Sequence, residues 1–139
     1  MRYFVVIVCV LSGLFANSYE KSLNIVTDNT HKLMWQDNSE VLEYLETYES
    51  AQIYCESIVL NGYIDWRVPT INEFVNIIDV RNKNAIHKSF QYIKPRFYNT
   101  ITSFANDNTI AWGIDFKSGS LSTTEKSTDN YIRCVRDIK

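Results

Sequence analysis

Two segments that lie far apart in the sequence constrain the fold of this chain more than any other feature. The first, residues 54–74, carries Cys55 on a helical pattern and continues into an aromatic and basic stretch. The second, residues 133–136, places Cys134 between two arginines. A bond between these cysteines, which lie 79 positions apart, limits the chain to folds that bring the two segments together.

The N-terminal residues 1–18 predict a secretory signal peptide. Arg2 precedes an apolar run from Tyr3 to Phe15, and Ala16 and Ser18 are small residues at the positions that a signal peptidase reads. The run of about 13 residues is shorter than the roughly 20 that span a bilayer. We therefore expect an exported protein, periplasmic or at the cell surface, with no transmembrane segment after cleavage.

The predicted cleavage leaves Cys55 and Cys134 as the remaining cysteines, and an exported domain with two cysteines most simply pairs them. The chain-entropy model gives such a bond a stabilising effect of about 4.5 kcal/mol at most. A redox or zinc site would need closely spaced cysteines or neighbouring histidines, whereas His31 and His87 stand alone. We predict no metal and no cofactor.

Length and charge favour one domain over residues 19–139, which is long enough to enclose a hydrophobic core. The whole chain has 14 basic and 16 acidic residues, a net charge of −2. This balance argues against a nucleic-acid surface over the whole protein but allows a local basic patch.

Hydrophobic spacing predicts two helices. The first spans 48–60, with Cys55 and Val59 on its buried face and Gly62 in its stop signal. The second starts at Thr70, which forms a capping box with Glu73, and ends near residues 79–81. The following residues, 82–99, lack periodicity and predict a long surface loop.

Strands are predicted at residues 32–37, in a hairpin over 112–126 and at 131–135. In the last of these, the period of two places Arg133 on one face and Cys134 with Arg136 on the other. We expect one arginine to be held in a structural ion pair and the other to be exposed.

Residues 33–37, 54–55, 62–70, 111–116 and 133–136 together resemble the motifs of the Lcl C-terminal domain family. That family is named for a bacterial collagen-like adhesin and was long catalogued as a domain of unknown function. The resemblance covers roughly residues 25–137, and the ordered set of motifs makes it specific.

The resemblance implies a C-type-lectin-like α+β fold, also similar to formylglycine-generating enzymes, with two helices packed on a twisted antiparallel sheet. In lectin-like folds a disulfide joins the first helix to the last strand, and Cys55 and Cys134 fall at matching places. Ile101 stands where the family usually has a tryptophan, so a sugar-stacking role is not carried over to that position.

The motif residues are interpreted mainly as architecture, because tryptophans and arginines in such clusters fill space and form ion pairs. The alternative is that Asp65, Trp66 and Arg67 hold a carboxylate or sulfate ligand. The positions with a predicted structural role are Trp35, Gly62, Asp65, Trp66, Arg67, Pro69, Thr70, Glu73, Trp112, Phe116, Arg133 and Arg136.

A basic and aromatic segment within the predicted loop is the candidate ligand-binding region. It forms a local positive patch on an acidic protein, although its aromatic residues also suit a loop anchored in the core. Its members are Lys88, Tyr92, Lys94, Arg96, Phe97 and Tyr98, of which all but Phe97 are candidate ligand contacts.

We expect a non-enzymatic binding or adhesion module that recognises a glycan or an extracellular or envelope protein through loops between residues 82 and 108. No nucleophile elbow, phosphate loop or zinc-spaced histidine pair is present in the sequence, and a disulfide would consume the thiols that formylglycine-type chemistry needs. The alternative is a structural or assembly component of the bacterial envelope without a small-molecule ligand. The sequence leaves oligomer formation open.

Overall fold

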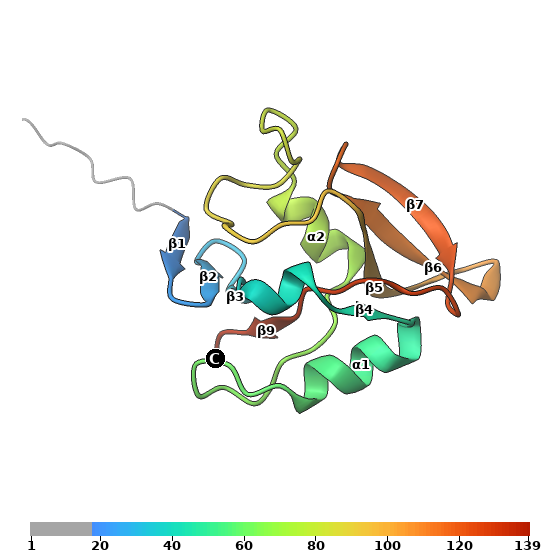
Figure 1. The fold of residues 1–139 in the computed structure, drawn as a ribbon, viewed down its shortest axis with the longest axis horizontal. Coiled ribbons are helices and arrows are strands. Elements are labelled where there is room, and N and C mark those ends of the chain that lie inside the picture. The colour runs from blue at the N-terminus through green and yellow to red at the C-terminus, as the bar shows by residue number, and fades with distance from the viewer. Residues whose placement is uncertain (1–17) are drawn as a thin grey trace, which may run out of the picture.

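The computed structural model describes residues 18–139, so the predicted signal peptide lies outside the described range except for Ser18. Within this range the chain forms two α-helices, one short 3-10 helix (Ser39–Leu42) and nine strands in two sheets (Figure 1). The fold is α+β, as predicted, but the strands do not form a single sheet. Neither α-helix in this range has the length and apolar character needed to cross a bilayer.

The first sheet, at the left of Figure 1, is antiparallel and has the strand order β1-β2-β3-β9. β3 is buried along its whole length, so it forms the centre of this part of the core. The strands are β1 (Tyr19–Ser22), β2 (Ile25–Asp28), β3 (Leu33–Gln36) and β9 (Val135–Asp137).

The second sheet, at the right of Figure 1, has the order β4-β8-β5-β6-β7. β5 pairs with β8 in parallel through Tyr98 and Tyr131, while the other pairs are antiparallel. The predicted antiparallel sheet is therefore mixed in this half. The strands are β4 (Leu45–Glu46), β5 (Phe97–Phe104), β6 (Asp107–Asp115), β7 (Ser120–Glu125) and β8 (Asn130–Tyr131).

The prediction of one last strand over 131–135 is wrong, because β8 and β9 belong to different sheets. Between them the N–H of Cys134 donates to Oε1 of Gln36 at 3.0 Å, and the Cys134 carbonyl accepts from the Gln36 N–H at 2.9 Å. The buried Gln36 side chain takes the place of a strand partner and allows the chain to cross from one sheet to the other.

Helix α1 (Tyr48–Ser57) begins with a capping box in which Thr47 and Ser50 satisfy each other's backbone N–H groups. It ends at Ser57, three residues before the predicted end. Beyond it, Asn61 and Gly62 form a two-residue turn with positive φ at both positions, joining Leu60 to Tyr63. Gly62 therefore forms a hairpin turn and does not terminate the helix.

Helix α2 (Ile71–Ile77) begins with the predicted capping box of Thr70 and Glu73. Its predicted end near residues 79–81 is too late, because Ile78 leaves the helix to form a β-bridge with Ile86. α2 is thus a helix of two turns between the two sheets.

The segment 82–99 is less exposed than predicted. Ala85, Ile86 and Phe90 are buried in or beside the core, and β5 already begins at Phe97. The segment therefore closes one side of the core as well as covering its surface.

The disulfide between Cys55 of α1 and Cys134 is confirmed, with a Cα–Cα distance of 5.6 Å. Both cysteines are fully buried and share an apolar cluster with Trp66, Val68 and Ile132. A second cluster, built around Trp35 and Phe74, fills the space between the first sheet and α2. The bond therefore lies in packed core and joins α1 to the chain between the two sheets.

A buried ion pair between Asp37 and Arg133 lies at the junction of the two sheets, and both side chains are inaccessible to solvent. Nη1 of Arg133 lies 3.2 Å from Oδ1 of Asp37 and 2.6 Å from the Gln36 carbonyl oxygen. The Asp37 carboxylate also accepts from the N–H groups of Gln91 and Tyr92, each at 3.0 Å, and from Lys21.

Removal of the disulfide should destabilise the protein strongly. We expect Cys55→Ala/Cys134→Ala to lower the free energy of unfolding by about 2–4 kcal/mol, because the unfolded chain gains the freedom of a long loop. Denaturant unfolding of both proteins measures the difference. A free energy of unfolding that is unchanged in the double variant would contradict the assignment.

Asp37 should make a pH-dependent contribution to stability. Burial alone would raise its pKa, but Arg133, Lys21 and two backbone N–H donors outweigh burial and hold the pKa below its ordinary value of 3.8. The unfolded chain therefore takes up this proton first, and stability falls as the pH falls through and below about 4.

Asp37→Asn should lower the free energy of unfolding by about 3–5 kcal/mol at neutral pH, because it leaves the Arg133 charge uncompensated in the core. The difference from the wild type should shrink as the pH is lowered toward 3, which urea unfolding at several pH values would measure. The exposed Asp129→Asn is the matched control and should show neither effect.

Candidate functional site

The second sheet has one covered face and one open face. Helix α2 packs on the covered face, where the Phe74 ring meets Tyr98 and Phe116 with centroid distances of 6.3 and 5.5 Å. Side chains alternate along a strand, so the neighbouring residues Phe97 and Asp115 point to the opposite face. These two residues are cross-strand partners in β5 and β6.

A hollow of about 340 Å³ lies on this open face, and we call it the sheet trough. It extends across β5, β6 and β7, with the turn before β7 and the start of β8 at its margins. The lining residues are Phe97, Asp115, Ser118, Ser120, Ser122, Thr123, Thr124 and Asn130.

The floor of the sheet trough depends on Gly113. A Cβ atom at Gly113 would lie 2.3 Å from two ring atoms of Phe97 and 2.6 Å from the Tyr98 carbonyl oxygen. Only a residue without a side chain allows the Phe97 ring to lie directly against β6. The result is an aromatic surface in the hollow that is partly exposed to solvent.

Several polar groups around this ring are free to bind a ligand. Oδ1 of Asp115 accepts from the Lys117 N–H at 2.8 Å, and Nδ2 of Asn130 donates to Asn99 at 3.1 Å. Among residues 18–139, no hydrogen-bond partner is found for Oδ2 of Asp115, the amide oxygen of Asn130 or the hydroxyls of Ser122 and Thr124.

The sheet trough therefore combines one aromatic ring, neutral hydroxyl and amide groups and a single carboxylate. Pyranose rings have one apolar face that packs on an aromatic side chain, and their hydroxyls hydrogen-bond to carboxylates, amides and other hydroxyls. Asp115 is the only charged residue of the lining, so the lining offers no cationic side chain to an anionic ligand.

The predicted basic and aromatic segment does not form one surface. Tyr98 is fully buried, and its hydroxyl accepts from the Lys94 N–H at 3.0 Å, so its predicted contact with a ligand is wrong. Tyr92 is partly buried against the core, and its carbonyl accepts from Arg133. Lys88 and Arg96 are exposed, but neither lines the sheet trough.

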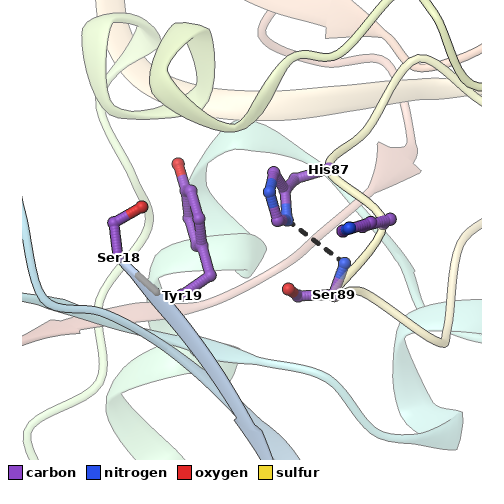
Figure 2. Close-up of a pocket in the computed structure, with 5 residues that line it drawn as sticks. Ser18, Tyr19, His87 and Ser89 are labelled. Atoms are coloured by element: carbon purple, nitrogen blue, oxygen red, sulfur yellow. Dashed lines mark hydrogen bonds between the residues drawn. The ribbon is translucent and has the colours of Figure 1, made fainter. Parts of the chain in front are cut away.

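Lys88 lies instead at a small cavity of about 90 Å³ between the start of β1 and the segment after Ile86 (Figure 2). The rings of Tyr19 and His87 stack in this cavity at a centroid distance of 4.1 Å, and Nδ1 of His87 accepts from the Ser89 N–H at 3.2 Å. The cavity is too small for a sugar ring, and the stack fastens β1 to the neighbouring loop.

Both stacked rings favour their uncharged forms. Burial lowers the pKa of His87, and burial together with the nearby Asp28 charge raises the pKa of Tyr19 to about 12. The stack is therefore neutral near pH 7, which suits a packing contact better than an acid–base role.

Two arginines of the motifs form ion pairs that join the C-terminal segment to the middle of the chain. Arg67 contacts both carboxylate oxygens of Glu73 at 2.7 Å and also binds Asp137 at 3.0 Å. Arg136 binds Asp65 at 2.6 Å, so the expectation that one of Arg133 and Arg136 is exposed is wrong.

Glu73 illustrates how these pairs are stabilised. Burial would raise its pKa, but the Arg67 guanidinium and the Thr70 N–H hold the pKa below its ordinary value. The Glu73 carboxylate also accepts from the Thr70 N–H at the start of α2. One side chain therefore connects the start of the helix to Arg67.

The aromatic and proline residues of the motifs lie in or near the core. Trp35, Trp66 and Phe116 are buried, and Nε1 of Trp66 donates to the Tyr63 carbonyl at 3.1 Å. Pro69 is buried and its carbonyl accepts from the Ile101 N–H, while Trp112 is partly exposed and packs against Phe104 at 5.7 Å. None of these residues lines the sheet trough.

Sequence reasoning placed Phe97 in the basic and aromatic segment but missed the other residues of the sheet trough. Two signals in the sequence point to this surface. Hydroxyl residues at every second position, Ser120, Ser122 and Thr124, indicate an exposed strand face, and a glycine inside a strand, Gly113, often marks a place where another group packs closely on the backbone. Neither signal predicts that β5 pairs with β6 and places Phe97 over Gly113.

Within residues 18–139, no group of three or more His, Cys, Asp or Glu side chains is arranged to hold a metal ion. The sequence model described as the Lcl C-terminal domain matches residues 24–136. No curated protein matches the chain.

Gly113→Ala should disturb both the fold and the sheet trough. We expect it to lower the free energy of unfolding by about 1–3 kcal/mol, because the new methyl group displaces the Phe97 ring. Denaturant unfolding tests this, with the adjacent exposed Ser122→Ala as a control that stays within about 0.5 kcal/mol of the wild type. Gly113→Ala should cost less in a Phe97→Ala background, and an equal cost in both would refute the contact.

Proposed function

The chain belongs to the Lcl C-terminal domain family, and we propose that it is an exported, non-enzymatic binding module that recognises a glycan in the sheet trough. The proposed site lies on the open face of β5, β6 and β7. Of the region 82–108 expected from the sequence, only Phe97 lines it.

The Phe97 ring is the observation that carries this proposal. A partly exposed aromatic ring in a hollow, held against a strand that has no side chain at the contact point, offers a flat apolar surface. Around it lie Oδ2 of Asp115, the Ser122 hydroxyl and the amide oxygen of Asn130, which have no hydrogen-bond partner among residues 18–139. This arrangement supplies stacking for one face of a sugar and hydrogen-bond acceptors and donors for its edge.

Charge narrows the class of glycan. The lining contains Asp115 and no cationic side chain, so it favours an uncharged sugar over a sulfated or carboxylated one. A carboxylate that accepts from two neighbouring sugar hydroxyls would also fix the orientation of the ring.

We also propose that the domain has a C-type-lectin-like fold. The buried disulfide from α1 to the chain just before β9 and the pair of short helices beside two small sheets support this assignment. Export is supported by the predicted signal peptide and by the disulfide, because such bonds persist in oxidising compartments.

The alternative is a structural or assembly component of the bacterial envelope. The specific observation in its favour is the outer edge of β7, a strand of six residues whose one partner strand among residues 18–139 is β6. Such an edge can accept a further strand from another polypeptide.

A glycan array followed by calorimetry of the best ligand tests the leading proposal. Phe97→Ala should weaken binding of a neutral glycan by about tenfold, because the stacking surface is lost. Phe104→Ala is the matched control, since its ring packs on Trp112 outside the sheet trough and its loss should leave the affinity unchanged.

The double variant Lys94→Ala/Arg96→Ala distinguishes binding in the sheet trough from binding at the basic and aromatic segment. Binding should be unchanged in that variant if the sheet trough is the site. Loss of binding there, with full binding in Phe97→Ala, would move the site to the basic segment. An array without any ligand would favour the envelope component.

A further inference from the structure

The hairpin turn formed by Asn61 and Gly62 contains the one Asn-Gly step in the sequence. Both residues are exposed, and their φ angles are positive, 51° and 79°. Such a turn favours asparagine followed by glycine, because few other residues adopt this backbone conformation. Asparagine is also chemically labile, most of all before glycine, where no side chain shields the next backbone nitrogen. The residues that this turn favours are therefore also reactive ones.

The backbone nitrogen of Gly62 is accessible for reaction. Among residues 18–139, no acceptor is found for its N–H group. No side chain crowds this position either, because a Cβ atom added to Gly62 would meet nothing within 4 Å outside the adjacent residues. The nitrogen therefore lies uncovered, directly after the Asn61 side chain that it would attack.

We propose that Asn61 is a modification site, at which the folded protein deamidates by reaction with its own backbone. The Gly62 nitrogen attacks Cγ of Asn61, the bond from Cγ to Nδ2 breaks, and the proton of the Gly62 N–H ends on the departing ammonia. The product of this step is a five-membered cyclic imide. Water then opens the imide at either carbonyl carbon and leaves aspartate or isoaspartate. The whole reaction consumes one water and releases one ammonia, and it needs neither an enzyme nor an oxidant.

Two hydrogen bonds restrain the Asn61 side chain and slow this reaction. Nδ2 of Asn61 donates to the Leu23 carbonyl at 2.7 Å, and Oδ1 accepts from Nδ2 of Asn24 at 3.3 Å. Ring closure joins Cγ to the Gly62 nitrogen and expels Nδ2, so the bond to Leu23 is lost. Local opening of these contacts therefore limits the rate in the folded protein.

Deamidation separates two turns that the Asn61 amide holds together. A carboxylate oxygen in place of Nδ2 cannot donate, and it would face the Leu23 carbonyl oxygen, so the turn between β1 and β2 loses its link to the Asn61-Gly62 turn. Isoaspartate has a further effect, because it adds a methylene to the backbone of a turn in which Leu60 and Tyr63 exchange both hydrogen bonds. Neither Asn61 nor Gly62 lines the sheet trough, so the inference is independent of the glycan proposal.

Peptide mapping by mass spectrometry tests the inference on the folded protein, incubated in mildly alkaline buffer. The gain of one mass unit should appear first at Asn61, as both aspartate and isoaspartate. The other asparagines are controls in the same sample, and Asn38 is the closest match, because it is hydrogen-bonded to Gln36 and precedes the small Ser39. Conversion that begins at another asparagine, or no conversion at Asn61 while the unfolded chain converts there, would overturn the inference.

Two variants test the chemistry and the restraint separately. Gly62→Ala shields the nitrogen with a methyl group and should slow conversion at Asn61 several-fold. Asn24→Gly removes the donor to Oδ1, tolerates the φ of 68° at position 24, and should accelerate conversion several-fold. Thermal unfolding verifies that each variant is folded, and equal rates in both variants and the wild type would contradict the mechanism.

The structural consequence is tested with Asn61→Asp, which has the sequence of one product. Its Tm should fall by a few degrees, because the link to the Leu23 carbonyl is lost. Asn106→Asp is the matched control, since it adds the same charge at another exposed asparagine and should leave the Tm unchanged. An equal Tm in Asn61→Asp and the wild type would show that the two turns stay joined after deamidation, against the inference.

Discussion

The buried Asp37–Arg133 pair is the interaction on which the rest of the structure depends. Asp37 directly follows β3 of the first sheet, and Arg133 lies where the chain crosses between the sheets. The Asp37 carboxylate also accepts from the N–H groups of Gln91 and Tyr92, so it binds the long segment between α2 and β5 as well. Both charges are out of water, so each group needs its partners to offset the cost of desolvation. The two sheets and the connecting segment can therefore take only one relative placement.

Aromatic rings complete this polar centre. Nε of Arg133 and Nε1 of Trp35 are buried donors without a hydrogen-bond partner among the described residues. The Arg133 guanidinium lies 4.8 Å from the centre of the Phe90 ring, and the Trp35 ring meets Phe90 nearly edge-on at 6.3 Å. The electron-rich face of Phe90 thus partly compensates the Arg133 guanidinium, which explains why a segment expected at the surface has its aromatic residue in the core.

Two kinds of feature are predictable from the sequence: those determined by residues close together in the chain, and those for which the residue types leave one possible pairing. The Thr70–Glu73 capping box depends on a spacing of three, and the disulfide depends on two cysteines being left to pair. The partner of Arg133 and the ring that covers Gly113 come from distant strands, so local patterns carry no information about them. Gly62 was misassigned because a helix stop and a hairpin turn both require positive φ, and the sequence signal is the same.

The position of Arg133 and Cys134 near the end of the chain also has a consequence for the order of folding. The ion pair spans 96 positions and the disulfide 79, and β9 enters the first sheet only with the last few residues. Contacts of such separation form late, because the loops they close are long. A chain that emerges from its N-terminus therefore lacks the Asp37–Arg133 pair, the disulfide and β9 until residues 133–137 arrive, so the contacts that lock the two sheets together are the last to form.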